Sequence, residues 1–375
     1  MSEVNEIVSA LIETDKCELT RAPTESVPVV LMTRIRLARN ISGFPFPNMA
    51  TPAQKEEIFQ LVEKVLREID EMKGANSFRM SELNDLDRNL LVERHLVSRE
   101  LCEGRPGSGA VINRSQTGSV MVNEEDHLRI QVLLSGLHMK KVFRMANRID
   151  DALERALDFA FSTDLGYLTS CPTNLGTAMR ASVMLHLPGL VLNQLMDKVV
   201  RGVNQIGIVV RGLFGEGSDA TGSIFQISNQ QTLGESEETI IRRLNHVIRA
   251  VIEQETNARY RLLEEQPSKL CDKIGRALGV LKNGHLLSSG ESMAFLSLMR
   301  LAVDLGFADA QWRAMIDRLM IEAQPGHVQY RADRQLSSEN RDASRADFLR
   351  REFANFPELN FGHLNGKGAG NQTRD

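Results

Sequence analysis

The chain has 375 residues, a length that suits two domains better than one small core. Its composition is that of an ordinary globular protein, with 42% hydrophobic residues, 25% charged residues and a formal net charge of −4. This balance argues against nucleic acid as the main partner, because proteins that neutralise phosphates usually carry a basic surplus. The sequence has no apolar run that could span a bilayer and no basic-then-apolar leader, so we expect no membrane partner.

The four cysteines are Cys17, Cys102, Cys171 and Cys271, and they are far apart and form no C-x-x-C pair. This spacing excludes the usual structural zinc motifs and a disulfide framework, and it indicates a reducing compartment. We therefore expect a cytoplasmic protein.

The first elements follow a turn-rich stretch that ends near Pro28. A strand is expected over 29–32. A helix follows, in which Thr51 is the N-cap, Pro52 takes the first helical position and Gly74 closes the end.

Strands and helices continue without strict alternation, which favours an α+β domain with a mainly antiparallel sheet flanked by helices. After about residue 260 the strand signals disappear, and a smaller all-α domain is expected. The predicted strands cover 110–113, 119–122, 130–134, 206–211 and 223–228, and the predicted helices 137–163, 175–187, 235–262, 268–282, 290–305, 309–322 and 341–354, with a loop around Pro325-Gly326. The expected organisation is an N-terminal extension over 1–27, an α+β domain over 28–259, a helical domain over 260–361, and a disordered tail over 362–375.

The common nucleotide and metal signatures are absent from the sequence. The glycines of 104–109 are not followed by the lysine of a P-loop, and no H-R-D with a downstream D-F-G occurs. There is no H-E-x-x-H or similar cluster, so no protein metal site is predicted.

Several segments instead place arginine beside glycine or carboxylate. Arg34 and Arg36 are two residues apart at a strand end, so their side chains would point to the same side. Arginines that converge from several segments could clamp a triphosphate, because guanidinium groups match phosphate oxygens and keep their charge. Taken singly, each arginine is typical of a solvated surface, and Cys171 of a small buried residue. The segments are 33–36, 123–129, 171–180 and 211–218.

These segments resemble, in order and in detail, the signatures of the phosphagen (guanidino) kinase family. T-R-I-R-L-A-R-N is similar to the family's first nucleotide-binding strand, and N-E-E-D-H-L-R to its acidic loop. C-P-T-N-L-G-T-A-M-R-A-S resembles the cysteine motif, and R-G-L-F-G-E-G-S the closing loop. The resemblance covers about residues 28–259.

Within that superfamily the chain resembles the bacterial protein-arginine kinases of McsB type. The nucleotide strand begins near residue 29, which leaves no room for the helical domain that precedes it in animal creatine and arginine kinases. The closing loop carries Phe214 where small-molecule kinases tend to have arginine. The motif Arg341-Asp342-Ala343-Ser344-Arg345-Ala346 fits the R-D-x-x-R-A sequence that binds phosphoarginine allosterically in that subfamily.

The resemblance implies transfer of the γ-phosphoryl of ATP, with Mg²⁺, to an arginine side chain of a protein. Glu125 and Glu216 would hold the substrate guanidinium, with Glu125 as the base, and Cys171 would lie beside the acceptor as a thiolate. His95 matches a position near the adenosine. The phosphates would be lined by Arg34, Arg36, Arg129, Arg180 and Arg211, and the remaining nucleotide contacts would come from Met32, Thr33, Ile35, Ala181, Ser182, Val183, Met184, Gly212, Leu213, Phe214, Gly215 and Glu216.

The resemblance also implies that 28–259 is the catalytic domain and 260–361 a dimerisation and regulatory domain, and it implies partners and a homodimer. The partners would be a zinc-containing activator of McsA type, a heat-shock repressor and a Clp-type unfoldase that recognises the phosphorylated arginine in bacterial protein quality control. Two alternatives stay open from the sequence. One is a kinase of free arginine or another small guanidino compound, and the other is an inactive adaptor that binds phosphoarginine.

Overall fold

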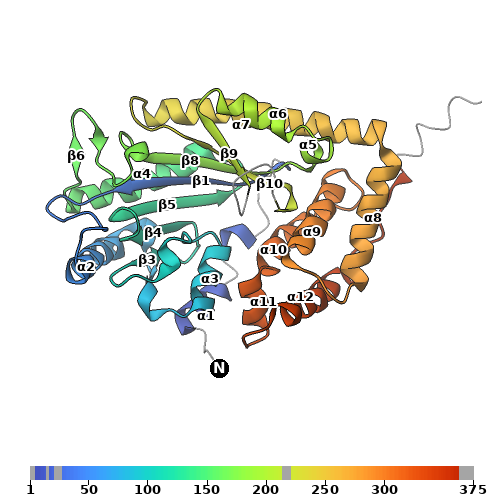
Figure 1. The fold of residues 1–375 in the computed structure, drawn as a ribbon, viewed down its shortest axis with the longest axis horizontal. Coiled ribbons are helices and arrows are strands. Elements are labelled where there is room, and N and C mark those ends of the chain that lie inside the picture. Colours follow the sequence, from blue (N-terminus) through green and yellow to red (C-terminus); the bar gives the residue numbers. More distant parts are fainter. Residues whose placement is uncertain (1–4, 14–16, 21–27, 213–220, 363–375) are drawn as a thin grey trace, which may run out of the picture. The chain divides into compact units, whose positions relative to one another are not determined.

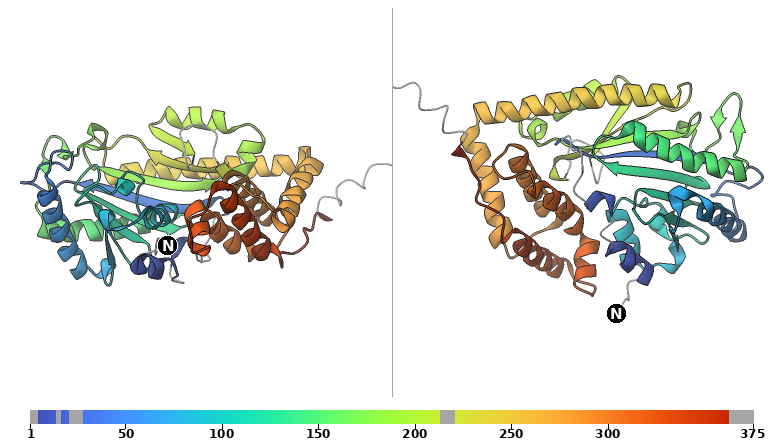
Figure 2. Two further views of the ribbon diagram at one scale, coloured as in Figure 1. Left: turned by 60° about the horizontal axis from the view of Figure 1, so that its bottom comes forward. Right: turned by 180° about the vertical axis from the view of Figure 1, so that it is seen from behind.

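The computed structural model describes residues 5–13, 17–20, 28–212 and 221–362 of the chain. Contacts divide it into two compact units (Figures 1 and 2). The first comprises Met1–Met184, Gly202–Val210 and Gln226–Ile248, and the second comprises Leu185–Arg201, Arg211–Phe225 and Arg249–Asp375. This division does not test the domain boundary expected at residue 259, which stays a prediction.

One sheet of eight strands runs through the described chain in the order β2-β3-β4-β5-β1-β8-β10-β9. The pairs β1·β5, β4·β5, β3·β4 and β2·β3 are antiparallel, so the predicted α+β class with a mainly antiparallel sheet is confirmed. A separate two-stranded sheet joins β6 to β7. The strands are β1 Val30–Arg39, β2 Asn76–Arg79, β3 Gly109–Ile112, β4 Gly118–Val122, β5 Leu128–Ser135, β6 Phe161–Ser162, β7 Gly166–Tyr167, β8 Met179–His186, β9 Ile208–Gly212 and β10 Ile224–Asn229.

Helix α2, Pro52–Glu68, begins as the sequence predicts and ends earlier. The Thr51 hydroxyl accepts a hydrogen bond from the backbone N–H of Gln54, and the Gln54 side-chain oxygen accepts one from the backbone N–H of Thr51, which completes a capping box. The helix ends at Glu68, and a short 3-10 turn over Asp70–Met72 precedes Gly74, which has a φ of +67°. The other helices wholly within the first unit are α1 Glu6–Ile12, α3 Asp85–Glu93 and α4 Met139–Ala156.

Two sequence predictions about secondary structure are wrong. The segment 175–187, predicted as a helix, contains strand β8, which lies between β1 and β10. Seven of its eight residues are buried, so the apolar and polar alternation that marks a half-exposed strand is missing. The predicted loop at Pro325-Gly326 is instead the start of helix α11, Pro325–Arg331, with Pro325 in the first turn.

After residue 260 every helix or strand that the structure describes is a helix, as predicted. In the second unit α9 packs against α8 and α10, and α12 packs against α8 and α11. No described helix has the length and apolar character needed to cross a bilayer. The helices are α5 Pro188–Leu192, α6 Met196–Asn204, α7 Glu237–Glu265, α8 Pro267–Asn283, α9 Ser289–Asp304, α10 Trp312–Glu322 and α12 Ser338–Phe353, of which α6 and α7 contribute residues to both units.

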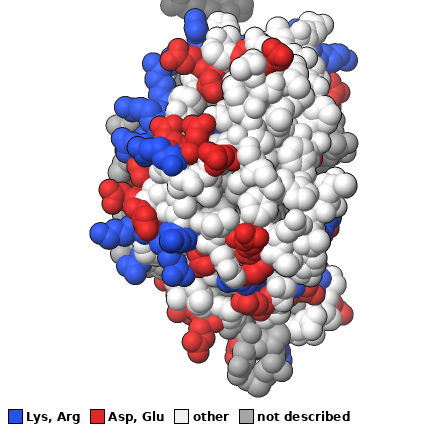
Figure 3. All heavy atoms as spheres, turned by 90° about the vertical axis from the view of Figure 1, so that its left-hand side faces the viewer, with Lys and Arg blue, Asp and Glu red and all other residues white. Residues whose placement is uncertain are grey.

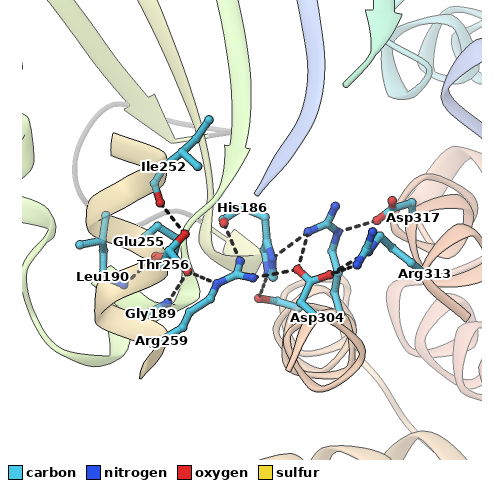
Figure 4. A network of polar contacts seen from close by, with 12 residues as sticks. His186, Gly189, Leu190, Ile252, Glu255, Thr256, Arg259, Asp304, Arg313 and Asp317 are labelled. Atoms are coloured by element: carbon cyan, nitrogen blue, oxygen red, sulfur yellow. Dashed lines mark hydrogen bonds and ion pairs between the residues drawn. The ribbon is translucent and has the colours of Figure 1, made fainter. Parts of the chain in front are cut away.

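A buried network of charged residues holds the second unit together (Figure 4). Asp304 on α9 is fully buried and accepts from Arg259 at 2.9 Å, Arg313 at 2.7 Å and Arg300 at 3.3 Å. Arg300 also contacts Asp317 at 2.7 Å. Because each buried charge has partners of opposite sign, the network avoids the cost of an isolated buried ion.

The same network includes His186, at the end of β8. The Nδ1 atom of His186 accepts from Arg300 at 3.2 Å, and its Nε2 atom lies 2.8 Å from the Ser297 hydroxyl. Burial and the neighbouring Arg300 keep the pKa of His186 well below its ordinary value, so the imidazole stays neutral. The network therefore reads as structural, with every cation matched by an acceptor.

Arg39, at the end of β1, has a comparable structural role in the first unit. Its guanidinium lies 2.6 Å from Asp150 of α4 and donates to the Ala38 carbonyl at 2.8 Å. It also stacks 3.5 Å from the ring centroid of Tyr167. Successive strand residues point to opposite faces, so Arg39 lies on the α4 face, and Arg34 and Arg36 lie on the other.

The pairing of Arg39 with Asp150, which Arg36 on the other face does not share, can be tested by measuring stability. We expect Arg39→Met to lower the free energy of unfolding by about 3–5 kcal/mol, because it leaves Asp150 buried without its partner. Arg36→Met is the matched control on the same strand and should leave stability unchanged or higher. Urea denaturation followed by circular dichroism measures both, and equal losses would contradict the assignment.

Candidate active site

Four of the predicted arginines lie on neighbouring strands of the first unit. Arg34 and Arg36 are on β1, Arg129 is on β5 and Arg180 is on β8. The antiparallel register sets Gln131 opposite Arg36 and Arg129 opposite Ala38. Directly opposite residues share a face, so Arg36 and Arg129 are diagonal neighbours on the face away from Arg39.

Arg34 and Arg36 have almost no polar partners. Arg34 donates from Nη2 to the Gln226 side-chain oxygen, and the Nε atoms of both arginines are buried with no acceptor. Within the part of the chain that the structure describes, neither forms an ion pair with a carboxylate. Buried donors without acceptors are costly, so a ligand that supplies acceptor atoms is expected here.

The electrostatics of this cluster also favour an anion. Burial, followed by repulsion from Arg129 and Arg180, lowers the pKa of Arg34 to about 10, so it keeps its charge at neutral pH. Burial and the neighbouring Arg34 hold the pKa of Arg36 well below its ordinary value. Buried positive charges held close together fit a polyphosphate, whose oxygens match guanidinium donors.

Glu124 is a residue of the site that the sequence reasoning missed. It is buried and forms a two-point pair with Arg129, with Nη1–Oε1 at 2.6 Å and Nη2–Oε2 at 2.5 Å. It also accepts from the Ser98 hydroxyl. The five-residue spacing between Glu124 and Arg129 is visible in the sequence. The sequence does not show which of the adjacent residues Glu124 and Glu125 is buried, so it could not show which of them pairs with Arg129.

Glu125 is the carboxylate of the acidic loop that remains open to solvent. Its side chain is 44% exposed and lies 3.6 Å from Arg129, against 2.5 Å for Glu124. Burial of the part that is covered, together with Asp126, raises the pKa of Glu125 above its ordinary value. A carboxylate with a raised pKa is a better base than an ordinary one.

The loop that carries Cys171 and runs to Thr177, called the cysteine loop below, is fixed to the acidic loop of 123–129 by contacts that involve the backbone. Asp126 is buried and accepts from the Ser170 backbone and from Asn40, both at 2.7 Å. The Ser170 hydroxyl donates to the Glu125 carbonyl at 2.8 Å. Cys171, the next residue, is partly buried, and its Sγ lies 3.0 Å from the Thr173 hydroxyl. The fold thus brings Cys171 and Glu125 to one junction.

His95 lies near the arginine cluster in a turn after α3, with a φ of +59°. Gln131 of β5 donates to its carbonyl at 2.8 Å. Burial, and to a smaller extent Arg34, lower the pKa of His95 to about 3, so the ring is neutral at physiological pH. A neutral, partly buried ring is compatible with the predicted place beside an adenosine, which stays a prediction.

The remaining predicted nucleotide residues fall on three strands. The Thr33 hydroxyl donates to the Gly136 carbonyl at 2.7 Å, and the Ser182 hydroxyl to the Arg34 carbonyl at 3.4 Å. Arg211 is exposed on β9 and belongs to the second unit. Met32 and Ile35 are buried on β1, Ala181, Val183 and Met184 are buried on β8, Gly212 ends β9, and Leu213, Phe214, Gly215 and Glu216 lie outside the described residues.

The predicted phosphoarginine motif lies on α12 of the second unit. Arg345 is buried and donates to the carbonyls of Ala323 and Leu287 and to Asp342, each at 2.7 Å. Arg341 is partly exposed and donates to the Leu336 carbonyl at 3.0 Å. The motif thus combines a buried anchor, Arg345, with two partly exposed groups, Arg341 and Asp342; Ala343 and Ser344 are partly exposed and Ala346 is buried.

The fold and the catalytic segment match one enzyme class. Residues 57–258 match the family described as ATP:guanido phosphotransferase, C-terminal catalytic domain. The structure is similar to that of a lombricine kinase, with a TM-score of 0.54, 26% identity, and coverage of 64% of this chain and 70% of that one. It shares the fold of a duplicated taurocyamine kinase from Schistosoma mansoni, with a TM-score of 0.57 at 21% identity over 78% of this chain and 49% of that one.

Relatives that align with most of this chain define the enzyme class more closely. Residues 267–364 match the protein-arginine kinase McsB C-terminal domain. The protein-arginine kinase of Pelotomaculum thermopropionicum is 42% identical over 88% of this chain and 93% of its own length. That of Symbiobacterium thermophilum is 44% identical, with coverage of 86% and 92%. The chain therefore belongs to the protein-arginine kinases, within the ATP:guanido phosphotransferase family.

The arginine cluster gives a prediction about nucleotide binding. Arg34→Met and Arg36→Met should each weaken ATP binding by about 2–5 kcal/mol, the usual cost of removing one partner of a desolvated charge contact. Isothermal titration with ATP and Mg²⁺ measures the loss. Arg67→Met, which removes an exposed arginine of α2, is the control and should bind normally. Unchanged affinity in both cluster variants would contradict the phosphate-binding role.

Proposed function

We propose that this chain transfers the γ-phosphoryl group of ATP to the guanidinium of arginine residues in proteins. The observation that carries the proposal is the arginine cluster of β1, β5 and β8, in which the buried Nε atoms of Arg34 and Arg36 have no acceptor among the described residues, next to the exposed carboxylate of Glu125. The names of the relatives support the same activity. The arginine cluster suits a polyphosphate, and the Glu125 carboxylate suits a guanidinium. These are the phosphoryl donor and the acceptor, which must lie side by side for the transfer.

The acceptor determines what the protein must supply. A guanidinium is a poor nucleophile, because its lone pairs are delocalised and its pKa exceeds about 12. Glu125 would orient it through paired hydrogen bonds and take the proton that leaves as the new P–N bond forms and the bond from the γ-phosphorus to the bridging oxygen breaks. Glu216 would be the second carboxylate by resemblance, and Cys171 would lie beside the acceptor.

The arginines would hold the phosphates and offset the charge that develops during transfer. In the described part of the chain, no group of three or more His, Cys, Asp and Glu side chains is placed to hold a metal ion. Mg²⁺ would be bound mainly by phosphate oxygens and water, as is usual at phosphoryl-transfer sites, and would neutralise part of the phosphate charge.

Replacing the proposed base is the sharpest test of the catalytic assignment. Glu125→Gln should lower kcat by about 100- to 10,000-fold, because the amide cannot accept the proton, and should leave ATP binding intact. Mass spectrometry of a substrate protein under neutral conditions measures phosphoarginine formation.

Glu100→Gln is the control for that experiment, since Glu100 is an exposed glutamate whose charge acts on Glu125. Near-normal turnover in Glu125→Gln would contradict the role of Glu125. A wild-type protein that phosphorylates free arginine but no protein would favour the small-guanidino kinase, and one that forms no phosphoarginine would favour the inactive adaptor.

We also infer a regulatory phosphoarginine site at α12. Arg345 holds Asp342 in place from the buried side, and Arg341 lies one residue before Asp342 on the partly exposed side. A cation beside an anion suits phosphoarginine, whose phosphoryl group would contact Arg341 and whose guanidinium would contact Asp342.

Arg341→Ala should therefore abolish binding of phosphoarginine measured by titration without ATP. Arg351→Ala is the control, because Arg351 lies on the same helix, pairs with Asp347 and is mostly exposed. Wild-type protein that shows no binding of phosphoarginine would reduce the motif to a structural contact.

The expected partners rest on family resemblance. We infer an activator of McsA type, a heat-shock repressor and a Clp-type unfoldase as partners, a homodimer, and a cytoplasmic role in stress response. Co-purification followed by mass spectrometry tests the partners, and sedimentation tests the dimer.

A further inference from the structure

An open cavity of about 320 Å³ lies beside the β6–β7 hairpin in the first unit. One wall is formed by the hairpin, including Phe161, Leu165 and Tyr167, and the other by the segment that precedes α7, including Leu233. Its floor includes Gly176 and Thr177, at the end of the cysteine loop. No step of the proposed chemistry uses this cavity.

The lining exposes apolar side chains to an unusual degree. Phe161 is 58% exposed, Leu233 51% and Leu165 43%. Only nine large hydrophobic side chains are exposed among the described residues, and three of them line this one cavity. A cluster of exposed apolar side chains typically marks an interaction site.

The charge of the cavity has one sign. Asp164, Glu235 and Glu237 line it, and no lysine or arginine does. Glu235 pairs with Arg243, whereas Asp164 and Glu237 form no ion pair with any described residue. The charged side chains on this end of the unit are seen in Figure 3, where acidic groups border a broad uncharged area and basic groups gather to one side. A partner with apolar and basic groups is complementary to this cavity.

Close backbone packing fixes the shape of the cavity. Gly166 and Gly176 have φ values of +72° and +95°, and a Cβ atom on Gly166 would lie 2.4 Å from the Gly176 carbonyl oxygen. The rings of Tyr167 and Phe161 meet edge to face with their centroids 5.3 Å apart, and the Arg39 guanidinium lies 3.5 Å from the Tyr167 centroid. The hairpin is therefore held against the cysteine loop by contacts that allow little movement.

The cavity is linked to the candidate active site through the loop that carries Cys171. The Thr232 hydroxyl donates to the carbonyls of Leu175 at 2.6 Å and Thr173 at 3.2 Å, so the second wall is bound to the cysteine loop. The other end of that loop carries Cys171 and is fixed to Glu125 through Ser170. A polypeptide with its arginine at Glu125 could extend along this loop to the cavity.

We propose that this cavity binds the stretch of substrate polypeptide beside the target arginine. This proposal rests on the proposed function. The preferred stretch carries a large apolar side chain between Leu165 and Leu233, with a lysine or arginine next to it facing Asp164 and Glu237. Free arginine has no such stretch. The cavity therefore selects protein segments that expose apolar and basic residues together, which folded surfaces rarely do.

Two peptides of equal length test the proposal. Each has one target arginine; one carries Leu and Lys a few residues away, and the other carries Ser at both positions. The measured quantity is the ratio of kcat/KM for the two. We expect wild-type protein to favour the Leu–Lys peptide by 10-fold or more, mainly through KM, and Leu233→Ser and Leu165→Ser each to bring the ratio close to one.

Asp164→Lys should lower the ratio as well, through repulsion of the peptide lysine. Leu61→Ser is the matched control, since Leu61 is an exposed leucine on α2, and it should keep the wild-type ratio. Equal kcat/KM for the two peptides with wild-type protein overturns the docking proposal even if a leucine variant fails to fold. Failure of wild-type protein to phosphorylate either peptide overturns the proposed function instead.

Discussion

The central constraint on the first unit is the burial of two like charges, Arg34 and Arg36, that have no carboxylate partner in the part of the chain that the structure describes. Arg34, Arg36, Arg129 and Arg180 converge on one face of the central sheet, where Arg129 pairs with Glu124 and Glu125, and Arg34 and Arg36 form no ion pair with a carboxylate that the structure describes. Such an arrangement lowers stability on its own, because like charges repel and buried donors lack acceptors. It is retained where a polyphosphate supplies the missing charge and acceptors, which is the constraint that the family's reaction imposes.

Three consecutive acidic residues show how the remaining charges are divided. Glu124 is buried against Arg129, and Asp126 is buried against Asn40 and the cysteine loop. Glu125 between them stays partly exposed, with a raised pKa. The outer two therefore fix the arginine and the loop, and the middle one remains free to meet an acceptor. The docking cavity lies further along the same loop, so positioning of the acceptor and recognition of its neighbours share one scaffold.

The sequence predicted correctly the features that depend on residues close together in the chain. The cap at Thr51, the antiparallel class and the helical chain after residue 260 follow from capping and periodicity. Burial on both faces removed the signal of β8, which was therefore predicted as a helix. Spacing also could not show that Arg39 pairs with Asp150 while Arg36 has no carboxylate partner among the described residues, or that Arg345 is buried, because these differences depend on residues more than 50 positions away. Family resemblance supplied the site, and the structure supplied the distinction between its arginines.

The most direct measurement of the central claim is the chemical nature of the bond that the protein forms. Label from γ-³²P-ATP should appear on a substrate protein, and it should be lost in mild acid and kept in mild base, because phosphorus bound to a guanidinium nitrogen is acid-labile. A ³¹P spectrum of the neutral product should show the same phosphoramidate. Label that survives acid, as phosphate esters of serine or tyrosine do, would contradict the account.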